Sequence, residues 1–233
     1  MKLSTYIIGG AFLAGLALTV TGAATMKTRD NCGIKSHWDE SAEVALPAEF
    51  KAIKVTSQPT DYEYWIHNFN GITITTSDSI SAPVLHTEAG FGMILSQSLQ
   101  GETLVLTIDP ENWIDSEKKN SVYGFYIDES WPITIELPAG MTLDYISSAD
   151  YSVALHHLDY DRLTVDTDKR LLLYQSNIDE LKCPRGKIEE LKLDQSSIAH
   201  AIITGMDDDF RINTCKGTGK ISSLSINTET APQ

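Results

Sequence analysis

The sequence is poor in cysteine and in positive charge. Three cysteines stand in 233 residues, and no pair has Cys-x-x-Cys spacing, so neither a zinc ribbon nor a thioredoxin-like redox site is expected. In an oxidising compartment one disulfide bond and one spare thiol are possible. Only 18 Lys and Arg oppose 32 Asp and Glu, which gives a net charge of −14. Because an acidic surface repels phosphate backbones, nucleic acid is not expected as a partner.

The motifs of common enzyme chemistry are also missing. The chain contains no Gly-x-Ser-x-Gly elbow, no phosphate-binding glycine loop and no His-Glu-x-x-His. The Gly-Thr-Gly-Lys that begins at Gly217 lacks the rest of a P-loop and fits a turn. No nucleophile stands in a pattern with a base. We therefore expect a protein that is not an enzyme, with no catalytic residue, no cofactor and no metal site.

Beyond the N-terminal segment, no run of eleven or more residues has a helical stripe, and the body of the chain has the texture of strands. Successive side chains of a strand point to opposite faces, so apolar and polar residues alternate. This alternation occurs at residues 50–55, 71–76, 103–108 and 132–137. Residues 111–131 interrupt the rhythm and are expected to form a long loop or hairpin. The sequence thus predicts an all-β body.

The first 26 residues differ from the rest. Residues 6–26 contain no charged side chain, and Lys27 follows them. A secretory signal has an apolar stretch of about 7–15 residues and a small-residue cleavage site, which cleavage after Ala24 would satisfy. The run also reaches the roughly 20 residues that span a bilayer, so an uncleaved N-terminal anchor helix is the alternative. Both interpretations place the body outside the cytoplasm.

After Gly140 a short pattern recurs, in which three apolar residues are spaced by two residues and then by one. It occurs at residues 160–166, 178–183, 188–194, 207–213 and 221–227, with Asp207 in the first place of the fourth copy. Apolar pairs at Leu171/Leu173 and Ile198/Ile202 fill the gaps between these copies. Strand centres therefore recur at roughly ten-residue intervals, with a longer last step, which is typical of a solenoid whose coils bury their faces by stacking. Residues 187–194 (KIEELKLD) and 220–227 (KISSLSIN) are expected at equivalent places on the coil. A β-sandwich is the alternative.

These patterns resemble a known family. The F-x-x-I-x-V strand at residues 50–55, the I-x-I-x-L-P at residues 133–138 and the later L-x-V and L-x-L-D repeats resemble auto-transporter adhesin head domains, known as GIN domains, of Bacteroidetes envelope proteins. The resemblance covers residues 50–227 and implies a right-handed β-solenoid (β-helix). It implies no established activity, cofactor or catalytic residue. The aromatic stretch at residues 62–69 and the insertion at residues 111–131 depart from the family.

Two polar clusters have the right chemistry for a metal ion but poor spacing. His156 and His157 precede two carboxylates in HHLDYD, yet adjacent residues of a strand point to opposite faces. We interpret this hexamer as the polar edge of a surface strand. Residues 206–210 (MDDDF) supply three carboxylates, the ligand type that Ca²⁺ prefers, without the spacing of known calcium loops. We interpret them as an acidic turn.

Two further features allow a binding or catalytic hypothesis. Several repeats end in Asp or Asn, at Asp166, Asp194, Asn213 and Asn227. If these residues lay along one edge of the solenoid, the carboxylates among them could form the acid–base pair of a glycoside hydrolase. Asp and Asn also tolerate left-handed turns, and we favour this explanation because it accounts for all four positions. The aromatic residues between positions 60 and 69 could stack on a sugar or a protein. Since the stretch is apolar on both strand faces, we favour a buried role for it, as a cap that covers the open end of the solenoid.

The sequence therefore predicts a signal peptide or membrane anchor (residues 1–26), a tether (residues 27–48) and a β-solenoid GIN-like domain (residues 49–229). We expect a non-enzymatic adhesin or binding module of the cell envelope, in the periplasm or at the cell surface, whose partner is a protein or a glycan. One alternative is a carbohydrate-active enzyme on a β-helix scaffold. Another is a periplasmic scaffold or sensor component that residues 6–26 anchor in the membrane.

Overall fold

The computed structural model describes most of the body of the chain. The described residues are 33–35, 41–58, 65–67, 69–88, 92, 94–109, 124–126, 131–148, 150–184, 188–204, 210–215 and 218–227. The predicted signal or anchor, most of the tether and the acidic run at residues 207–209 lie outside them. Across this described part, no helix is long and apolar enough to cross a membrane.

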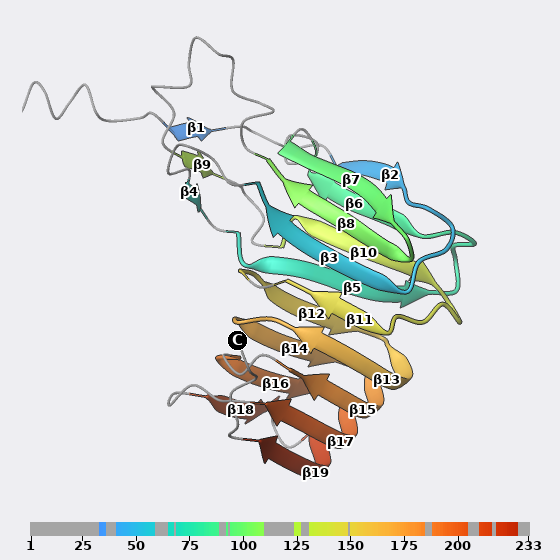
Figure 1. Cartoon of the computed structure of the whole chain (residues 1–233), viewed down its shortest axis with the longest axis vertical. Coiled ribbons are helices and arrows are strands. Elements are labelled where there is room, and N and C mark those ends of the chain that lie inside the picture. The colour runs from blue at the N-terminus through green and yellow to red at the C-terminus, as the bar shows by residue number, and fades with distance from the viewer. Residues whose placement is uncertain are drawn as a thin grey trace, which may run out of the picture.

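Two eight-stranded sheets make up the fold (Figure 1). Sheet I has the order β18 (Arg211–Thr214), β16 (Glu190–Asp194), β14 (Arg170–Tyr174), β12 (Ser152–His156), β5 (Gly71–Ser77), β10 (Ile133–Pro138), β6 (Val84–Glu88) and β2 (Ser41–Ala45). Sheet II has the order β19 (Lys220–Asn227), β17 (Ser197–Thr204), β15 (Asn177–Cys183), β13 (Asp159–Asp166), β11 (Tyr145–Ser147), β3 (Ala52–Ser57), β8 (Thr103–Ile108) and β7 (Leu95–Gln100). A small third sheet joins β1 (Gly33–Lys35), β9 (Gly124–Tyr126) and β4 (Trp65–His67).

The prediction of an all-β body is confirmed. The four alternating runs correspond to β3, β5, β8 and β10. Both large sheets are mixed, because β2, β6 and β7 pair antiparallel with their neighbours, whereas the strands from β11 onward pair in parallel. The antiparallel strands therefore gather in the N-terminal half, and the regular parallel stacking begins after β10.

From β11 to β19 the chain alternates between the two sheets, one strand in each. In sheet I, Val153 of β12 pairs with Leu171 of β14, which pairs with Leu191 of β16. In sheet II, Leu163 of β13 pairs with Leu181 of β15. Each circuit of the chain thus contains two strands, which explains the roughly ten-residue spacing of the sequence pattern. The same arrangement stacks similar side chains on one another in successive circuits.

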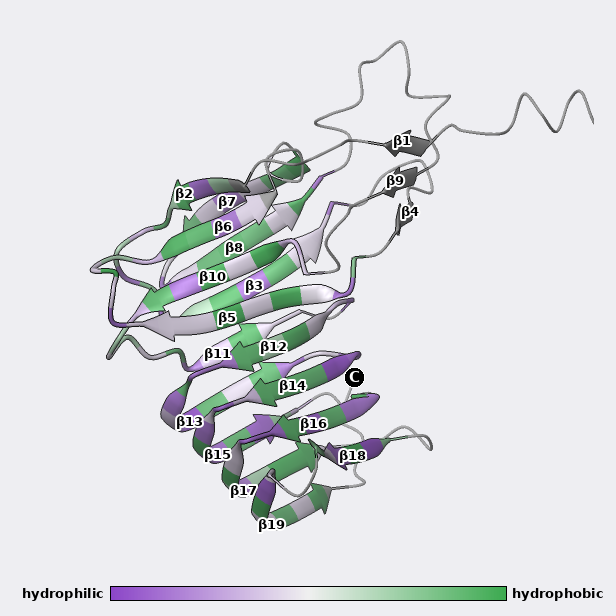
Figure 2. Ribbon diagram, turned by 180° about the vertical axis from the view of Figure 1, so that it is seen from behind, coloured by the Kyte–Doolittle hydropathy of each residue, from purple (hydrophilic) through white to green (hydrophobic). Residues whose placement is uncertain are grey.

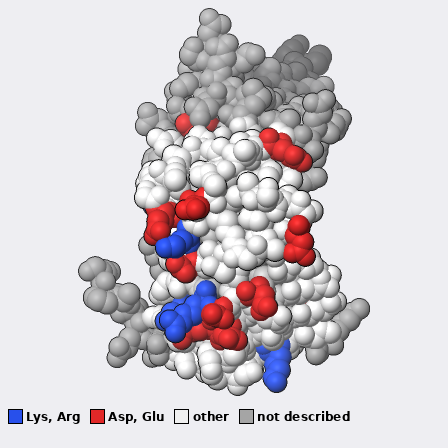
Figure 3. Space-filling model, turned by 90° about the vertical axis from the view of Figure 1, so that its right-hand side faces the viewer, with Lys and Arg blue, Asp and Glu red and all other residues white. Residues whose placement is uncertain are grey.

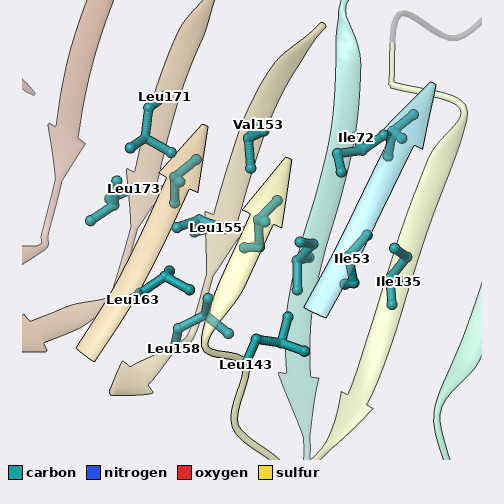
Figure 4. Packing of buried hydrophobic residues seen from close by; sticks show 14 of the residues in the cluster. Ile53, Ile72, Ile135, Leu143, Val153, Leu155, Leu158, Leu163, Leu171 and Leu173 are labelled. Carbon is teal, nitrogen blue, oxygen red and sulfur yellow. The ribbon is translucent and has the colours of Figure 1, made fainter. Parts of the chain in front are cut away.

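The core lies between the two sheets and is built from these stacked side chains. Leu171, Leu181 and Leu191 are fully buried, and Figure 4 shows their neighbours Val153, Leu155 and Leu163 pointing into the same space. Figure 2 shows the result as hydrophobic bands that continue from strand to strand. Burying one such side chain stabilises a fold by about 1.5–3 kcal/mol. The three-residue apolar pattern arises because its members face this core.

The two clearest copies of the pattern are not at equivalent places, and this prediction was wrong. Residues 187–194 lead into β16 of sheet I, whereas residues 220–227 form β19 of sheet II. The pattern is the same because both sheets present an apolar face to one core. The copies also differ in burial. Leu191 is fully buried, but Leu224 is 38% exposed because β19 is the outermost strand of its sheet.

Gly71 permits a close approach between the two halves of sheet I. A Cβ atom on Gly71 would lie 1.9 Å from the carbonyl oxygen of Ser152, which is far inside van der Waals contact. Gly71 opens β5, and Ser152 opens β12, the strand that pairs with it in parallel. Only glycine therefore fits where the N-terminal half meets the first regular circuit.

Candidate binding surface on the strand turns

The candidate HHLDYD motif lies at a turn that recurs in later circuits. His157 follows β12 and has a φ of 58°, while Gln175 after β14 and Gln195 after β16 have φ values of 47° and 50°. We call residues 156–159, 174–177 and 194–197, which carry the chain from sheet I to sheet II, the turn edge. All three left-handed residues occupy the same position in their circuits, so their side chains project from the same side of the molecule.

The left-handed residues are not those that the sequence predicted. Asp166, Asp194, Asn213 and Asn227 are absent from the positive-φ positions, and of the four only Asp194 is next to a left-handed residue, Gln195. Hydrogen bonds between circuits offset the cost of the left-handed conformation. The backbone amide of His157 donates to the backbone carbonyl of Tyr174 at 3.1 Å. One circuit later, the backbone amide of Gln175 donates to the backbone carbonyl of Asp194 at 3.0 Å. Each turn is therefore held in position by the next one.

Buried serines reinforce the turn edge from inside. Ser176 is fully buried, and its hydroxyl accepts a hydrogen bond from the amide of Leu158 at 3.1 Å. Ser196 takes the same role one circuit later and accepts from the amide of Ser176 at 3.1 Å. The hydroxyl of Ser176 also lies 3.0 Å from the carbonyl oxygen of Tyr174. Because buried polar groups cost free energy without partners, these bonds favour one fixed turn conformation.

The exposed side of the turn edge carries paired amides and hydroxyls. The side-chain amide of Gln175 donates to the side-chain oxygen of Gln195 at 2.9 Å. The hydroxyl of Ser197 donates to the side-chain oxygen of Asn177 at 2.7 Å. These contacts order four polar side chains from two neighbouring circuits and leave further donors and acceptors on each of them for solvent or a ligand.

The turn edge also carries an aromatic cluster, which includes Tyr174, the residue before Gln175. The ring centroid of Tyr174 is 5.4 Å from that of His156 and 6.0 Å from that of His157. Burial, followed by the neighbouring His157, lowers the pKa of His156, so its neutral form is favoured at pH 7. The turn edge therefore carries one phenol and a neutral imidazole as well as the paired amides.

The two histidines do not form a metal centre with their neighbours. Their ring centroids are 6.4 Å apart, and the rings stand nearly perpendicular to each other. Within the described ranges, no three His, Cys, Asp or Glu side chains are grouped closely enough to hold a metal ion. The acidic residues 207–209 lie outside those ranges, so the calcium hypothesis stays untested. Cys183 and Cys215 are both free thiols.

The structure does not bring the candidate hydrolase carboxylates together. Asp166 ends β13 in sheet II and is 2% exposed, with the hydroxyl of Tyr145 donating to it at 2.8 Å. Asp194 ends β16 in sheet I. Asn213 lies within β18, and Asn227 ends β19. These four residues therefore belong to different sheets and do not share one edge.

The sequence does contain a signal for the turn edge. Residues 174–177 read YQSN and residues 194–197 read DQSS, so a Gln-Ser pair recurs one circuit apart. The glutamine is the exposed left-handed residue, and the serine is the buried one.

The turns of this edge lie on the side of the molecule that faces the viewer in Figure 3, where charged side chains stand in small groups with uncharged surface between them.

Comparisons with known proteins do not assign this chain to a family. No protein-family model matches it. A 1,3,6,8-tetrahydroxynaphthalene synthase from Streptomyces griseus is 29% identical over 141 residues, which is 60% of this chain but only 35% of that enzyme. The chain thus spans about a third of the curated relative that it matches.

Similar solved structures share little sequence with the chain. A candidate lipid-binding protein from Parabacteroides distasonis has a TM-score of 0.40 and 11% identity over 81% of this chain and 93% of that one. A candidate adhesin from Bacteroides fragilis has a TM-score of 0.33 and 13% identity over 81% of this chain and 96% of that one. At these TM-scores the likenesses carry no argument about function.

Proposed function

We propose that this protein is a non-enzymatic, extracytoplasmic binding module whose turn edge binds a neutral glycan. The observation that carries the proposal is the ordered set of amides and hydroxyls on Gln175, Gln195, Asn177 and Ser197 in the same turns as the aromatic residue Tyr174. The adhesin-like role expected from the sequence is a role of this kind. The GIN resemblance, with its Bacteroidetes envelope origin, agrees with it.

The scaffold that we propose is a right-handed β-solenoid. The in-register parallel pairing of β12, β14 and β16 supports it, as does the alternation of the chain between the sheets. Connections between parallel strands of one sheet are right-handed in about 98% of cases, which favours that hand. In such a stack each circuit fixes the next, so exposed side chains of successive circuits keep a constant spacing.

That spacing suits a polysaccharide chain. Neighbouring strands lie about 4.8 Å apart, which is close to the length of one sugar unit in an extended glycan. Amides and hydroxyls form hydrogen bonds with sugar hydroxyls, and an aromatic ring packs against the apolar face of a pyranose. A protein partner would instead require a central apolar cluster, and the exposed side chains of the turn edge are mostly polar.

The carboxylates singled out in the sequence do not favour the hydrolase alternative. A glycoside hydrolase needs two carboxyl groups within about 5–9.5 Å of each other. Asp166 is buried in sheet II, and Asp194 lies at the end of a strand in sheet I. The hydroxyl of Thr218 donates to Asp194 at 3.3 Å, a contact that serves the turn. We therefore propose binding without cleavage.

Binding of defined hexasaccharides tests this function. The probes are β-1,4-linked glucose, α-1,4-linked glucose and β-1,4-linked N-acetylglucosamine hexamers, titrated calorimetrically into the full chain. We expect at least one probe to bind, and Tyr174→Ala to weaken it at least tenfold. Gln175→Asn keeps a residue that tolerates the left-handed turn but shortens the amide, so we expect about a three- to tenfold loss.

Gln58→Asn is the matched control, because Gln58 is exposed just after β3 and remote from the turn edge. We expect it to bind like the unmodified protein. Failure of all three probes to bind, or equal losses in Gln175→Asn and Gln58→Asn, would remove the turn edge as a glycan site. Release of shorter sugars during the titration would restore the hydrolase alternative.

A further inference from the structure

A cavity lies outside the turn edge, where three segments meet at the start of β3. Its volume is about 400 Å³, within the usual range of ligand pockets. It is lined by Ala48, Glu49, Phe50, Lys51, Gly101, Glu102 and Met141. The first four precede β3, the next two form the turn between β7 and β8, and Met141 follows β10. The cavity therefore belongs to the N-terminal half of the molecule.

Backbone hydrogen bonds fix the walls of this cavity. The amide of Lys51 donates to the carbonyl of Glu102 at 2.8 Å, and the amide of Asp144 donates to the carbonyl of Lys51 at 2.7 Å. Gly101 has a φ of 62°, which turns the chain between β7 and β8 at little cost. The three segments are thus tied together before any ligand is bound, so little ordering is required on binding.

The cavity is apolar inside and acidic at its rim. Phe50 is 3% exposed, and Met141 packs against the core, so both provide an apolar floor. At the rim, the ammonium group of Lys51 lies 2.9 Å from a carboxylate oxygen of Glu102. That hydrogen bond, together with the nearby charges of Glu102 and Asp144, raises the pKa of Lys51, so its ammonium stays charged.

The rim has a surplus of negative charge. Glu49 lines the cavity together with Glu102 and Lys51, and Asp144 is near enough to act on Lys51. Among the lining residues two carboxylates, Glu49 and Glu102, therefore accompany one ammonium group, and that ammonium is already paired with Glu102. The whole chain is also negatively charged, with a net charge of −14. A cationic ligand is favoured over a neutral or anionic one.

We infer that this cavity binds a basic side chain of a partner polypeptide, lysine or arginine, together with an adjacent apolar residue. The aliphatic stem of the basic residue packs on Phe50 and Met141, while its charged end reaches Glu49 at the rim. Met141 is suited to this contact because its thioether side chain adapts to different shapes. A neutral glycan would leave the apolar floor and the excess charge unused, which separates this site from the turn edge.

Tripeptide binding tests the inference on the full chain. The probes are acetylated, amidated Leu-Lys-Leu and Leu-Arg-Leu, with Leu-Gln-Leu as the neutral control. Binding is followed by NMR through the labelled methyl group of Met141, which is assigned by its loss in Met141→Leu. We expect both basic peptides to shift this signal and to bind at least fivefold more tightly than Leu-Gln-Leu.

Two charge-removing variants separate the cavity from general acidic attraction. Glu49→Gln should weaken the basic peptides at least threefold. Asp179→Asn removes the same charge from an exposed position on β15 and should leave their affinity unchanged. Equal binding of all three peptides, equal losses in both variants, or an unmoved Met141 signal would overturn the inference. None of these outcomes depends on whether the turn edge binds a glycan.

Discussion

Ser176 has a role that its residue type alone does not reveal. Serine is usually exposed, yet Ser176 is fully buried and bonds both to its own turn and to the preceding one. Gln175 beside it takes a left-handed conformation that glutamine rarely adopts. Neither property follows from local sequence, because the partners that stabilise them lie one circuit away. This is why the sequence favoured Asp194 over its neighbour Gln195 as the left-handed residue of the turn after β16.

Removing the buried hydroxyl should measurably destabilise the protein. Ser176→Ala removes the hydroxyl oxygen that accepts a hydrogen bond from the backbone amide of Leu158 at 3.1 Å. A buried donor left without an acceptor costs about 1–3 kcal/mol. Urea denaturation measures the change in unfolding free energy. Ser98→Ala, at an exposed position on β7, is the control and should be nearly neutral. A Ser176→Ala variant as stable as this control would contradict the role of the buried serines.

Glu136 predicts a pH dependence of stability. Hydrogen bonds from Ser77 and then from His86, whose ring nitrogen lies 2.7 Å away, lower the pKa of Glu136 below 4.5. A carboxyl group with a lowered folded-state pKa stabilises the fold above its unfolded pKa and loses that contribution as the pH falls through the folded value. We therefore expect Glu136→Gln to lose less stability than the unmodified protein between pH 6 and pH 3, as urea denaturation at each pH would show. Parallel curves for the two proteins would contradict this.

At the scale of elements, the sequence predicted strands better than it predicted their partners. Alternation identified β3, β5, β8 and β10, and the repeated apolar pattern identified β13, β15, β16 and β19. It did not separate sheet I from sheet II, because strands of both sheets bury the same kind of face. Sheet membership depends on where each turn directs the chain. The copies at residues 187–194 and 220–227 were placed wrongly for this reason.

Burial along the stack predicts graded effects of truncation. Leu191→Ala should destabilise by about 2–5 kcal/mol, because Leu191 is fully buried between β14 and β18. Leu224→Ala should cost clearly less, because Leu224 is 38% exposed on the outermost strand. Glu190→Ala should change stability by no more than about 0.5 kcal/mol. Denaturant melts of the three variants decide this, and a tolerant Leu191 beside a sensitive Glu190 would mean that the register is wrong.

At the scale of the whole molecule, the sequence predicted an all-β body and the presence of a repeat, but not the turn edge. The Gln-Ser pairs at residues 175–176 and 195–196 become a surface only when the circuits stack. The cavity by Lys51 was equally hidden, because its walls come from three segments that are far apart in sequence.

The charge-free run at residues 6–26 leads us to expect the body of the protein outside the cytoplasm, whether the run is cleaved or retained. Fractionation of the native source, with protease added to intact cells and to cells with a permeabilised envelope, measures this location. We expect the chain in the periplasm, the membrane fraction or the cell surface. Recovery of the full-length protein in the soluble cytoplasmic fraction would contradict it.

The central claim is that turns from successive circuits form one glycan-binding surface. Hydrogen–deuterium exchange, with and without the hexasaccharide that binds most tightly, tests it directly. We predict that the ligand slows exchange together in peptides that contain His157, Gln175 and Gln195, which lie 18 and 20 residues apart in sequence. Turns on the opposite side, such as the one at Asp168, should be unaffected. Protection confined to a single segment, or centred on that opposite side, would contradict the account.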